Sequence, residues 1–304
     1  MIEQNQISPN FRSGYVSIFG EPNVGKSTLM NAILNTKLSI TTPKPQTTRR
    51  KILGIYSDDE TQIIFLDTPG LIEPKYLLQK KMVENIHSAL NECDIILTVI
   101  DTTERVIQNF DSKIIPALLP YDGVKNIFLV INKIDLITKE KLLELIDRFK
   151  DKFKFNEIVP VSALHQFNID ELTRTLKQYL PVHPPYFPTD ILSQEPERFF
   201  IAELIREKIF ELYREEVPYS TEVIVTDYKE RPKGKDYINA EIIVERESQK
   251  RIIIGKNGEA LKRVGEKARH DIEQFLGRKV YLELFVKVRE NWRDSSLWLK
   301  NFGY

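Results

Sequence analysis

The sequence has almost no cysteine, because Cys93 is the only one. A single thiol cannot form a disulfide within the chain, which excludes the disulfide-rich class of small secreted domains. We therefore expect Cys93 to be a buried core thiol in a reducing compartment. Residues 1–10 contain no basic segment followed by an apolar one, and no run of about 18 apolar residues occurs anywhere. Neither secretion nor membrane spanning is expected.

Net charge is also lacking, since 44 Lys and Arg residues balance 44 Asp and Glu residues. A neutral chain does not attract polyanions over its whole surface, so any nucleic-acid contact must come from a local cluster of cations. The 304 residues are 41% apolar and 29% charged, which is the composition of a folded protein with room for two domains.

Short β-rich runs alternate with longer helical stretches from residue 15 to about residue 180. This alternation predicts an α/β domain with a mostly parallel sheet that helices cover on both faces. Loops at the carboxyl ends of the strands are then expected to hold the ligand. The expected strands are residues 15–19, 62–66, 95–100, 126–131 and 157–161, and the expected helices are residues 26–35, 75–90, 139–152 and 170–180.

Four prolines between residues 181 and 188 end this pattern. Proline cannot continue a helix and favours an extended connection, so we expect a Pro-rich linker over residues 183–196. The expected domains are therefore residues 1–182 and 197–304. In the second, helices near 199–213 and 258–275 and strands at 222–226, 237–244 and 280–288 predict a smaller α+β domain.

Residues 20–27 read G-E-P-N-V-G-K-S and match the phosphate-loop pattern G-x-x-x-x-G-K-[ST]. Glycines allow the backbone N–H groups to converge on phosphate oxygens. Lys26 would bridge the β- and γ-phosphates, and the Ser27 hydroxyl would bind Mg²⁺. The pattern directly follows a predicted strand and precedes a predicted helix, a context that an accidental glycine turn rarely has.

Two further motifs end predicted strands. In D-T-P-G, the carboxylate of Asp67 can hold a Mg²⁺-bound water, and the Gly70 N–H can sense the γ-phosphate. In N-K-I-D, a buried carboxylate at Asp135 can accept from the ring N–H and the exocyclic amine of guanine together, whereas adenine lacks this donor pair. The sequence therefore predicts a site for GTP or GDP with Mg²⁺.

A second signature lies at residues 251–258, where an apolar run enters G-K-N-G before a predicted helix. This is the KH pattern, in which a glycine-flanked loop lets two helices approach the backbone of about four unpaired nucleotides. Between residues 246 and 269, eight Lys or Arg residues stand against three Glu residues, an excess of five positive charges. We expect this module to bind RNA through Lys256 and its neighbours.

The order of these motifs resembles the Era family of bacterial ribosome-assembly GTPases over essentially the whole chain. P-Q-T-T-R at residues 45–49 and S-A-L at residues 162–164 contribute to the resemblance. It implies a P-loop GTPase domain, which hydrolyses GTP to GDP and phosphate, followed by a type II KH domain. We expect the chain to be a monomer. It also implies that the KH domain binds the 3′ end of 16S ribosomal RNA under nucleotide control during maturation of the 30S subunit.

The resemblance also implies residue roles. Asn132 orients the base loop, Lys133 covers a face of the purine, and a backbone N–H of residues 162–164 meets the guanine oxygen. The polar loop 41–50 is the first switch, in which Thr47 or Thr48 closes on Mg²⁺, and we favour Thr48. Leu71 stands where many GTPases carry a water-orienting glutamine, so slow intrinsic hydrolysis is expected.

The predicted site residues fall into four groups. We expect Lys26, Thr48 and Gly70 to act in catalysis, and Ser27, Thr48 and Asp67 to bind the metal. The nucleotide contacts are expected from Gly20, Glu21, Pro22, Asn23, Val24, Gly25, Lys26, Ser27, Thr28, Asp67, Thr68, Pro69, Gly70, Leu71, Asn132, Lys133, Asp135, Ser162, Ala163 and Leu164. The RNA contacts are expected from Arg251, Ile254, Gly255, Lys256, Asn257, Gly258, Lys262 and Arg263.

Two other functions compete with this interpretation. A membrane-associated GTPase without an RNA role could lay its basic helix on anionic lipid, although such a helix needs no G-x-x-G loop. An ATPase acting on RNA is disfavoured by Asp135. The expected location is the cytoplasm, and a peripheral contact with the inner membrane is left open.

Overall fold

The central strands form where apolar and β-branched residues run without interruption. The computed structural model describes residues 8–304, so that residues 1–7 of the unassigned N-terminal segment lie outside the description. All seven residues of β3 (Thr61–Asp67) and of β4 (Ile95–Asp101) are buried. Strands that helices cover on both faces show this continuous pattern rather than an alternating one.

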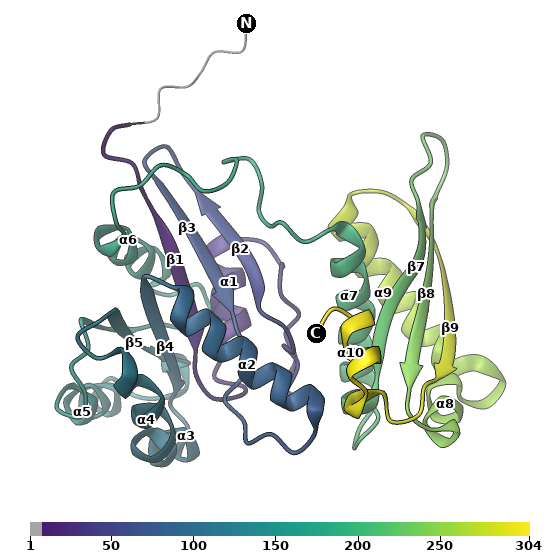
Figure 1. The fold of residues 1–304 in the computed structure, drawn as a ribbon, viewed down its shortest axis with the longest axis horizontal. Helices are drawn as coiled ribbons and strands as arrows, with labels where there is room; N and C mark the ends of the chain where they lie inside the picture. The colour runs from purple at the N-terminus through teal and green to yellow at the C-terminus, as the bar shows by residue number, and fades with distance from the viewer. Residues whose placement is uncertain (1–7) are drawn as a thin grey trace, which may run out of the picture. The chain divides into compact units, whose positions relative to one another are not determined.

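These strands belong to a six-stranded sheet in the order β2-β3-β1-β4-β5-β6. Every neighbouring pair is parallel except β2 and β3, which run antiparallel. In Figure 1, α2 crosses in front of this sheet and α1 lies behind it. The predicted α/β fold with a mostly parallel sheet is confirmed.

The described chain divides into two compact units. Unit 1 consists of the residues up to Ser39, Thr48–Glu73 and Met82–Gln194, and unit 2 consists of Ile40–Thr47, Pro74–Lys81 and Glu195–Tyr304. The elements up to residue 194 are β1 (Arg12–Phe19), α1 (Lys26–Leu34), β2 (Ile52–Ser57), β3, α2 (Leu77–Glu92), β4, α3 (Glu104–Asn109), α4 (Ile115–Leu118), β5 (Asn126–Asn132), α5 (Lys139–Lys150), β6 (Glu157–Pro160) and α6 (Ile169–Tyr179). Strand β2 and helices α3 and α4 were not predicted.

The carboxyl ends of the parallel strands meet at one edge of the sheet. Ile18 of β1 pairs with Asp67 of β3, and Asp101 of β4 pairs with Asn132 of β5. The phosphate loop, D-T-P-G and N-K-I-D therefore leave the sheet on the same side. This is the position at which open α/β sheets bind their ligands.

The Pro-rich segment is bonded to unit 1 rather than spanning free space. The His183 N–H donates to the Phe11 carbonyl at 3.0 Å, and Gln62 donates from its side-chain amide to the Phe187 carbonyl at 2.9 Å. The His183 ring also stacks on Tyr186, with 4.2 Å between the ring centroids. The predicted domain boundaries themselves stay a prediction.

Unit 2 is built around a three-stranded sheet in the order β7-β8-β9. Its core joins apolar residues of α7, β8 and α9, among them Ile205, Ile242 and Ile272, which are fully buried. The order α-β-β-α-α-β contains every element predicted for the α+β module, and it adds helix α8, which was not predicted. The elements are α7 (Glu197–Leu212), β7 (Glu222–Lys229), β8 (Asp236–Val244), α8 (Glu247–Ile254), α9 (Glu259–Leu276), β9 (Val280–Val288) and α10 (Ser296–Asn301).

The C-terminal tail, to which the sequence assigned no role, packs on this module. Trp292 is fully buried and donates from its indole N–H to the Ser220 carbonyl at 2.9 Å. The Tyr304 hydroxyl donates to Glu222 at 2.5 Å. The tail therefore completes the core of unit 2.

Cys93 follows α2 and is buried, as predicted. Burial raises the pKa of its thiol to about 11. A thiol in this environment is rarely a thiolate and so is a poor nucleophile, which fits a packing role. Across residues 8–304, no helix has the length and apolar character needed to cross a membrane.

Candidate functional site

The phosphate loop connects the end of β1 to the start of α1. Gly25 adopts φ 97°, and a Cβ at this position would lie 2.3 Å from the Asn132 amide nitrogen, so only glycine fits. The Lys26 side chain folds back over the loop and donates to the carbonyls of Gly20 at 3.1 Å and Glu21 at 2.9 Å. Its burial lowers the pKa of the ammonium group to about 8, against the raising influence of Asp67 and Glu21.

The three predicted metal ligands lie together. Ser27 Oγ lies 2.9 Å from Thr48 Oγ1 and donates to Asp67 Oδ2 at 2.6 Å. Asp67 is fully buried, and its other carboxylate oxygen, Oδ1, has no hydrogen-bond partner. Burial raises the pKa of this carboxyl, and the Ser27 hydrogen bond and Lys26 oppose the rise. Two hydroxyls and a buried carboxylate with one unsatisfied oxygen form an oxygen donor set that suits Mg²⁺.

Thr47 and Thr48 have different neighbours despite being adjacent in the chain. Within unit 2, the Thr47 hydroxyl lies 2.6 Å from Thr42 Oγ1 and donates to the Lys44 carbonyl at 2.8 Å. The Thr47 carbonyl accepts from Arg206 at 2.6 Å. The Thr47 hydroxyl is therefore engaged locally, whereas the Thr48 hydroxyl lies beside Ser27 in unit 1.

The remaining D-T-P-G residues shape the loop after β3. The Thr68 hydroxyl is buried and donates to the Ile18 carbonyl at 2.7 Å, which ties the loop to β1. The Leu71 N–H donates to the Gly20 carbonyl at 3.1 Å. Thr68 and Leu71 thus donate hydrogen bonds to backbone carbonyls of the protein. The Leu71 side chain has no polar group that could bind a water molecule.

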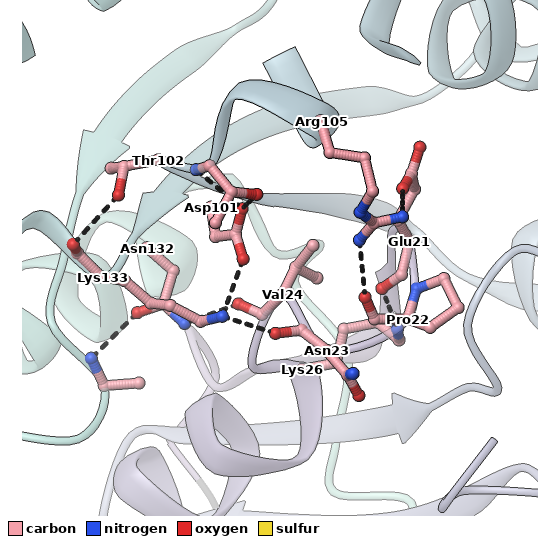
Figure 2. Close-up of polar contacts among 12 residues, drawn as sticks. Glu21, Pro22, Asn23, Val24, Lys26, Asp101, Thr102, Arg105, Asn132 and Lys133 are labelled. Atoms are coloured by element: carbon pink, nitrogen blue, oxygen red, sulfur yellow. Dashed lines mark hydrogen bonds and ion pairs between the residues drawn. The ribbon is translucent and has the colours of Figure 1, made fainter. Parts of the chain in front are cut away.

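The predicted base-reading residues converge on the phosphate loop. Asn132 donates to the Val24 carbonyl at 2.8 Å and accepts from the Ala163 N–H at 3.0 Å. Lys133 donates to the Asn23 carbonyl at 2.6 Å. Figure 2 shows Asn132 and Lys133 both directed at this loop.

Asp135 lies next to these residues and accepts from the Ser162 hydroxyl at 2.5 Å. Its side chain is 25% exposed, and His165 Nε2 lies 3.7 Å away. The prediction that this carboxylate is buried is wrong for the protein alone, because a base-reading group needs an open face toward the incoming base. The Ser162 contact orients the carboxylate without closing that face.

Two functional candidates were missed in the sequence. Asp101 ends β4 and forms an ion pair with Lys133 at 2.7 Å. Arg105 lies in the first turn of α3 and pairs with Glu21 at 2.7 Å. The sequence offers a weak indication for Asp101, because this residue follows an apolar strand as Asp67 does. No sequence pattern points to Arg105.

The second site is the turn between α8 and α9. Gly255 adopts φ 69°, and a Cβ there would lie 2.6 Å from the Ala260 Cβ, so the close approach of the two helices requires glycine. Asn257 and Gly258 also have positive φ, and the turn closes with a Gly258 N–H to Gly255 carbonyl bond of 3.3 Å. Lys256 stands exposed at the tip.

A groove of about 430 Å³ runs beside this turn, between α9 and β9. Its lining is apolar at Leu261, Leu282 and Leu284, and it carries two cations and one acidic group, Lys262, Arg269 and Glu266. The predicted RNA residues Arg251, Lys262 and Arg263 are all exposed. An apolar groove with exposed cations can stack bases and contact phosphates.

The chain matches two family models in the same order. The model of the 50S ribosome-binding GTPase matches residues 15–133, and the KH domain model matches residues 216–293. GTPase Era of Geotalea uraniireducens is 50% identical over 294 residues, which are 97% of this chain and 98% of that protein. The chloroplastic ERA-like GTPase of Oryza sativa is 45% identical over 296 residues, which are 97% of this chain and 70% of that protein.

Two solved Era structures match this fold with a TM-score of 0.89, each over 97% of this chain and 99% of the other. One is a variant from Aquifex aeolicus bound to GDP and AlF₄⁻, at 44% identity. The other is Era in complex with MgGDPNP and nucleotides 1506–1542 of 16S ribosomal RNA, at 45% identity. The identity and coverage extend over both units, and this chain therefore belongs to the Era family of GTPases.

Proposed function

We propose that this GTPase binds 16S ribosomal RNA near its 3′ end through its KH domain and acts as a GTP-controlled switch in assembly of the 30S subunit. The observation that carries the proposal is the presence in one chain of two sites: a phosphate loop beside the oxygen cluster of Ser27, Thr48 and Asp67, and a cation-flanked G-x-x-G turn. The related Era complex holds both MgGDPNP and a 16S RNA segment, which supports it. The membrane-associated alternative without an RNA role has no comparable support.

In this proposal, the phosphate loop binds the diphosphate through its backbone N–H groups, and Lys26 moves from the loop carbonyls to the β- and γ-phosphates. Asp135 reads the guanine ring N–H and amine. Two of the three N–H groups of residues 162–164 are already engaged: the Ala163 N–H donates to Asn132, and the Ser162 N–H donates to the Phe167 carbonyl. We therefore assign the guanine oxygen to the N–H of Leu164.

Ser27, Thr48 and Asp67 would hold the Mg²⁺ ion, because their oxygens cluster around the unsatisfied Asp67 Oδ1. When bound, the ion offsets the charge that develops on the phosphate oxygens. Lys26 and the Gly70 N–H stabilise the same charge from the protein side as water attacks the γ-phosphoryl group in line. Leu71 cannot orient that water, so we expect slow intrinsic hydrolysis.

The two adjacent threonines give a sharp test of the metal site. In Thr48→Ala, the magnesium concentration that half-saturates GTP hydrolysis should rise about tenfold, because one oxygen ligand is lost from the set around Asp67. Thr47→Ala is the matched control, since the Thr47 hydroxyl bonds to Thr42 and Lys44. A magnesium titration of the GTPase rate measures both. A larger effect in Thr47→Ala would assign the metal to the other threonine.

The switch function is tested by RNA binding in two nucleotide states. Filter binding of a 3′-terminal 16S RNA fragment should give a higher affinity with a non-hydrolysable GTP analogue than with GDP, because the γ-phosphate orders the switch loops. A scrambled RNA of equal length is the control. Equal affinities in both states would remove the nucleotide control from the proposal, and equal affinity for the scrambled RNA would remove its specificity.

The location and the oligomeric state belong to the same proposal. We propose that the protein acts on 16S ribosomal RNA in the cytoplasm and that it does so as a monomer. The peripheral membrane contact that the sequence left open stays a prediction. Sedimentation with anionic vesicles, in the presence and absence of the RNA fragment, would test it.

A further inference from the structure

The backbone carbonyls of the phosphate loop point at side-chain donors one after another. Lys26 donates to the Glu21 carbonyl at 2.9 Å, Lys133 to the Asn23 carbonyl at 2.6 Å and Asn132 to the Val24 carbonyl at 2.8 Å. A loop whose N–H groups converge on phosphates turns its carbonyls outward, and each outward carbonyl needs its own donor. All three of these donors, Lys26, Lys133 and Asn132, belong to the nucleotide-binding motifs.

The carbonyl of Pro22 takes its donor from outside those motifs. Arg105 Nη2 lies 3.5 Å from this carbonyl, and Arg105 Nη1 donates to Glu21 Oε2 at 2.7 Å. Figure 2 shows the guanidinium between the Glu21 side chain and the loop backbone. Arg105 thus holds two consecutive residues of the phosphate loop from α3.

The ion pair between Arg105 and Glu21 differs from an ordinary surface ion pair because the Glu21 carboxylate is buried. Its side chain is 2% exposed, and its Oε1 has no hydrogen-bond partner. A buried carboxylate in a loop that receives phosphates repels them unless a cation offsets its charge. The Arg105 side chain is 59% exposed and forms an ion pair with this carboxylate. Removing it would take away the ion-pair partner of the Glu21 carboxylate, whose charge otherwise interacts with the buried Lys26 ammonium.

Asp101 acts on the other end of the loop through Lys133. Its Oδ1 accepts from the Thr103 N–H at 3.0 Å and from the Thr103 hydroxyl at 2.5 Å. Its Oδ2 pairs with Lys133 Nζ at 2.7 Å. The same ammonium donates to the Asn23 carbonyl, so Asp101 fixes the lysine that fixes the loop.

We propose that Asp101 and Arg105 are positioning residues, the β4–α3 brace, that hold the phosphate loop in its nucleotide-binding shape and so set the lifetime of bound nucleotide. They lie four residues apart, at the end of β4 and the start of α3, and fix the loop at Asn23 and at Glu21 and Pro22. Neither touches the reacting atoms. The inference rests on the nucleotide site proposed above and is independent of RNA binding.

The test measures release of fluorescent GDP from the full-length protein after a chase with unlabelled GDP. Arg105→Ala and Asp101→Asn should each release GDP about tenfold faster. The first leaves the buried Glu21 carboxylate without its ion-pair partner, and the second removes the carboxylate that holds the Lys133 ammonium against the loop. Arg105→Lys should restore most of the wild-type rate, because a lysine can still reach Glu21. Arg174→Ala is the matched control, because its ion pair with Glu171 on α6 is exposed, and release should stay within about twofold of wild type.

A double variant tests whether Arg105→Ala speeds GDP release through the unpaired Glu21 carboxylate or through a general loss of loop structure. Glu21→Gln combined with Arg105→Ala should release GDP more slowly than Arg105→Ala alone, because no unpaired carboxylate remains near the phosphates. In steady-state hydrolysis, Arg105→Ala should raise KM for GTP by a larger factor than it changes kcat.

Three results would overturn the brace. They are unchanged GDP release in both Arg105→Ala and Asp101→Asn, an equal acceleration in Arg174→Ala, and a double variant that releases GDP as fast as or faster than Arg105→Ala. If the wild-type protein itself did not bind fluorescent GDP, the proposed nucleotide site would fail. If the wild type bound fluorescent GDP and the variants released it at the wild-type rate, the brace alone would be refuted.

Discussion

In Asp135→Asn, GDP affinity should fall by about 100-fold to 1000-fold, and the variant should prefer xanthosine nucleotides. The wild-type carboxylate offers two acceptors to the ring N–H and the amine of guanine. An amide offers one acceptor and one donor, so it faces the guanine amine with a mismatched group. Xanthine carries an oxygen in place of that amine, which the amide can donate to. Calorimetry with GDP and with XDP, both with magnesium, measures the exchange.

The Asp135 contacts make this substitution conservative in shape. Asn keeps an oxygen that can accept from Ser162, which now contacts Asp135 at 2.5 Å. Asp147→Asn is the matched control, because Asp147 lies on α5 with 71% of its side chain exposed and pairs with nearby Lys150. Its GDP affinity should match wild type. If Asp135→Asn kept the wild-type preference for guanosine nucleotides, Asp135 would not be the base reader.

Reversing the charge at Lys256 should weaken RNA binding about 10-fold to 100-fold at low salt and leave RNA-independent GTP hydrolysis within about twofold of wild type. Lys256 stands exposed at the tip of the G-x-x-G turn, where the backbone of the RNA must pass. Lys256→Asp removes a cation and adds an anion that repels phosphate. The slope of log affinity against log salt should therefore fall by about one to two. Fluorescence anisotropy of an RNA oligonucleotide at several salt concentrations measures this.

Lys141→Asp provides the control for charge. Lys141 is a half-exposed lysine on α5 of unit 1, where it pairs with Glu144. The same change of charge there should alter neither RNA affinity nor hydrolysis by more than about twofold. A parallel loss of RNA binding and GTPase activity in Lys256→Asp would contradict a separate RNA module.

Motifs whose chemistry depends on neighbouring residues were predictable. The phosphate loop needs glycines, a lysine and a hydroxyl at fixed spacing because the N–H groups of one short loop must meet one diphosphate. The predicted strand of residues 126–131 led directly to Asn132, and β5 ends there. The alternation of strands and helices likewise predicted the parallel sheet.

Elements with weak local patterns were not predictable. Strand β2 has Gly54 in its interior, which weakens any strand pattern, and it gains its place by pairing with β3. A Cβ at Gly54 would lie 2.8 Å from Leu34, so the glycine reflects packing against α1. Trp292 and the tail gave no motif, because their role is to cover the core of unit 2.

The sequence by itself determined which chemistry this protein carries, because each GTP-binding motif, like the G-x-x-G turn, lies within a few consecutive residues. Only the tertiary structure decided which partners hold that chemistry in place. Asp101 reaches Lys133 across 32 positions of the chain, and Arg105 reaches Glu21 across 84. No spacing rule connects such residues, because they meet only when the carboxyl ends of parallel strands are brought to one edge of the sheet.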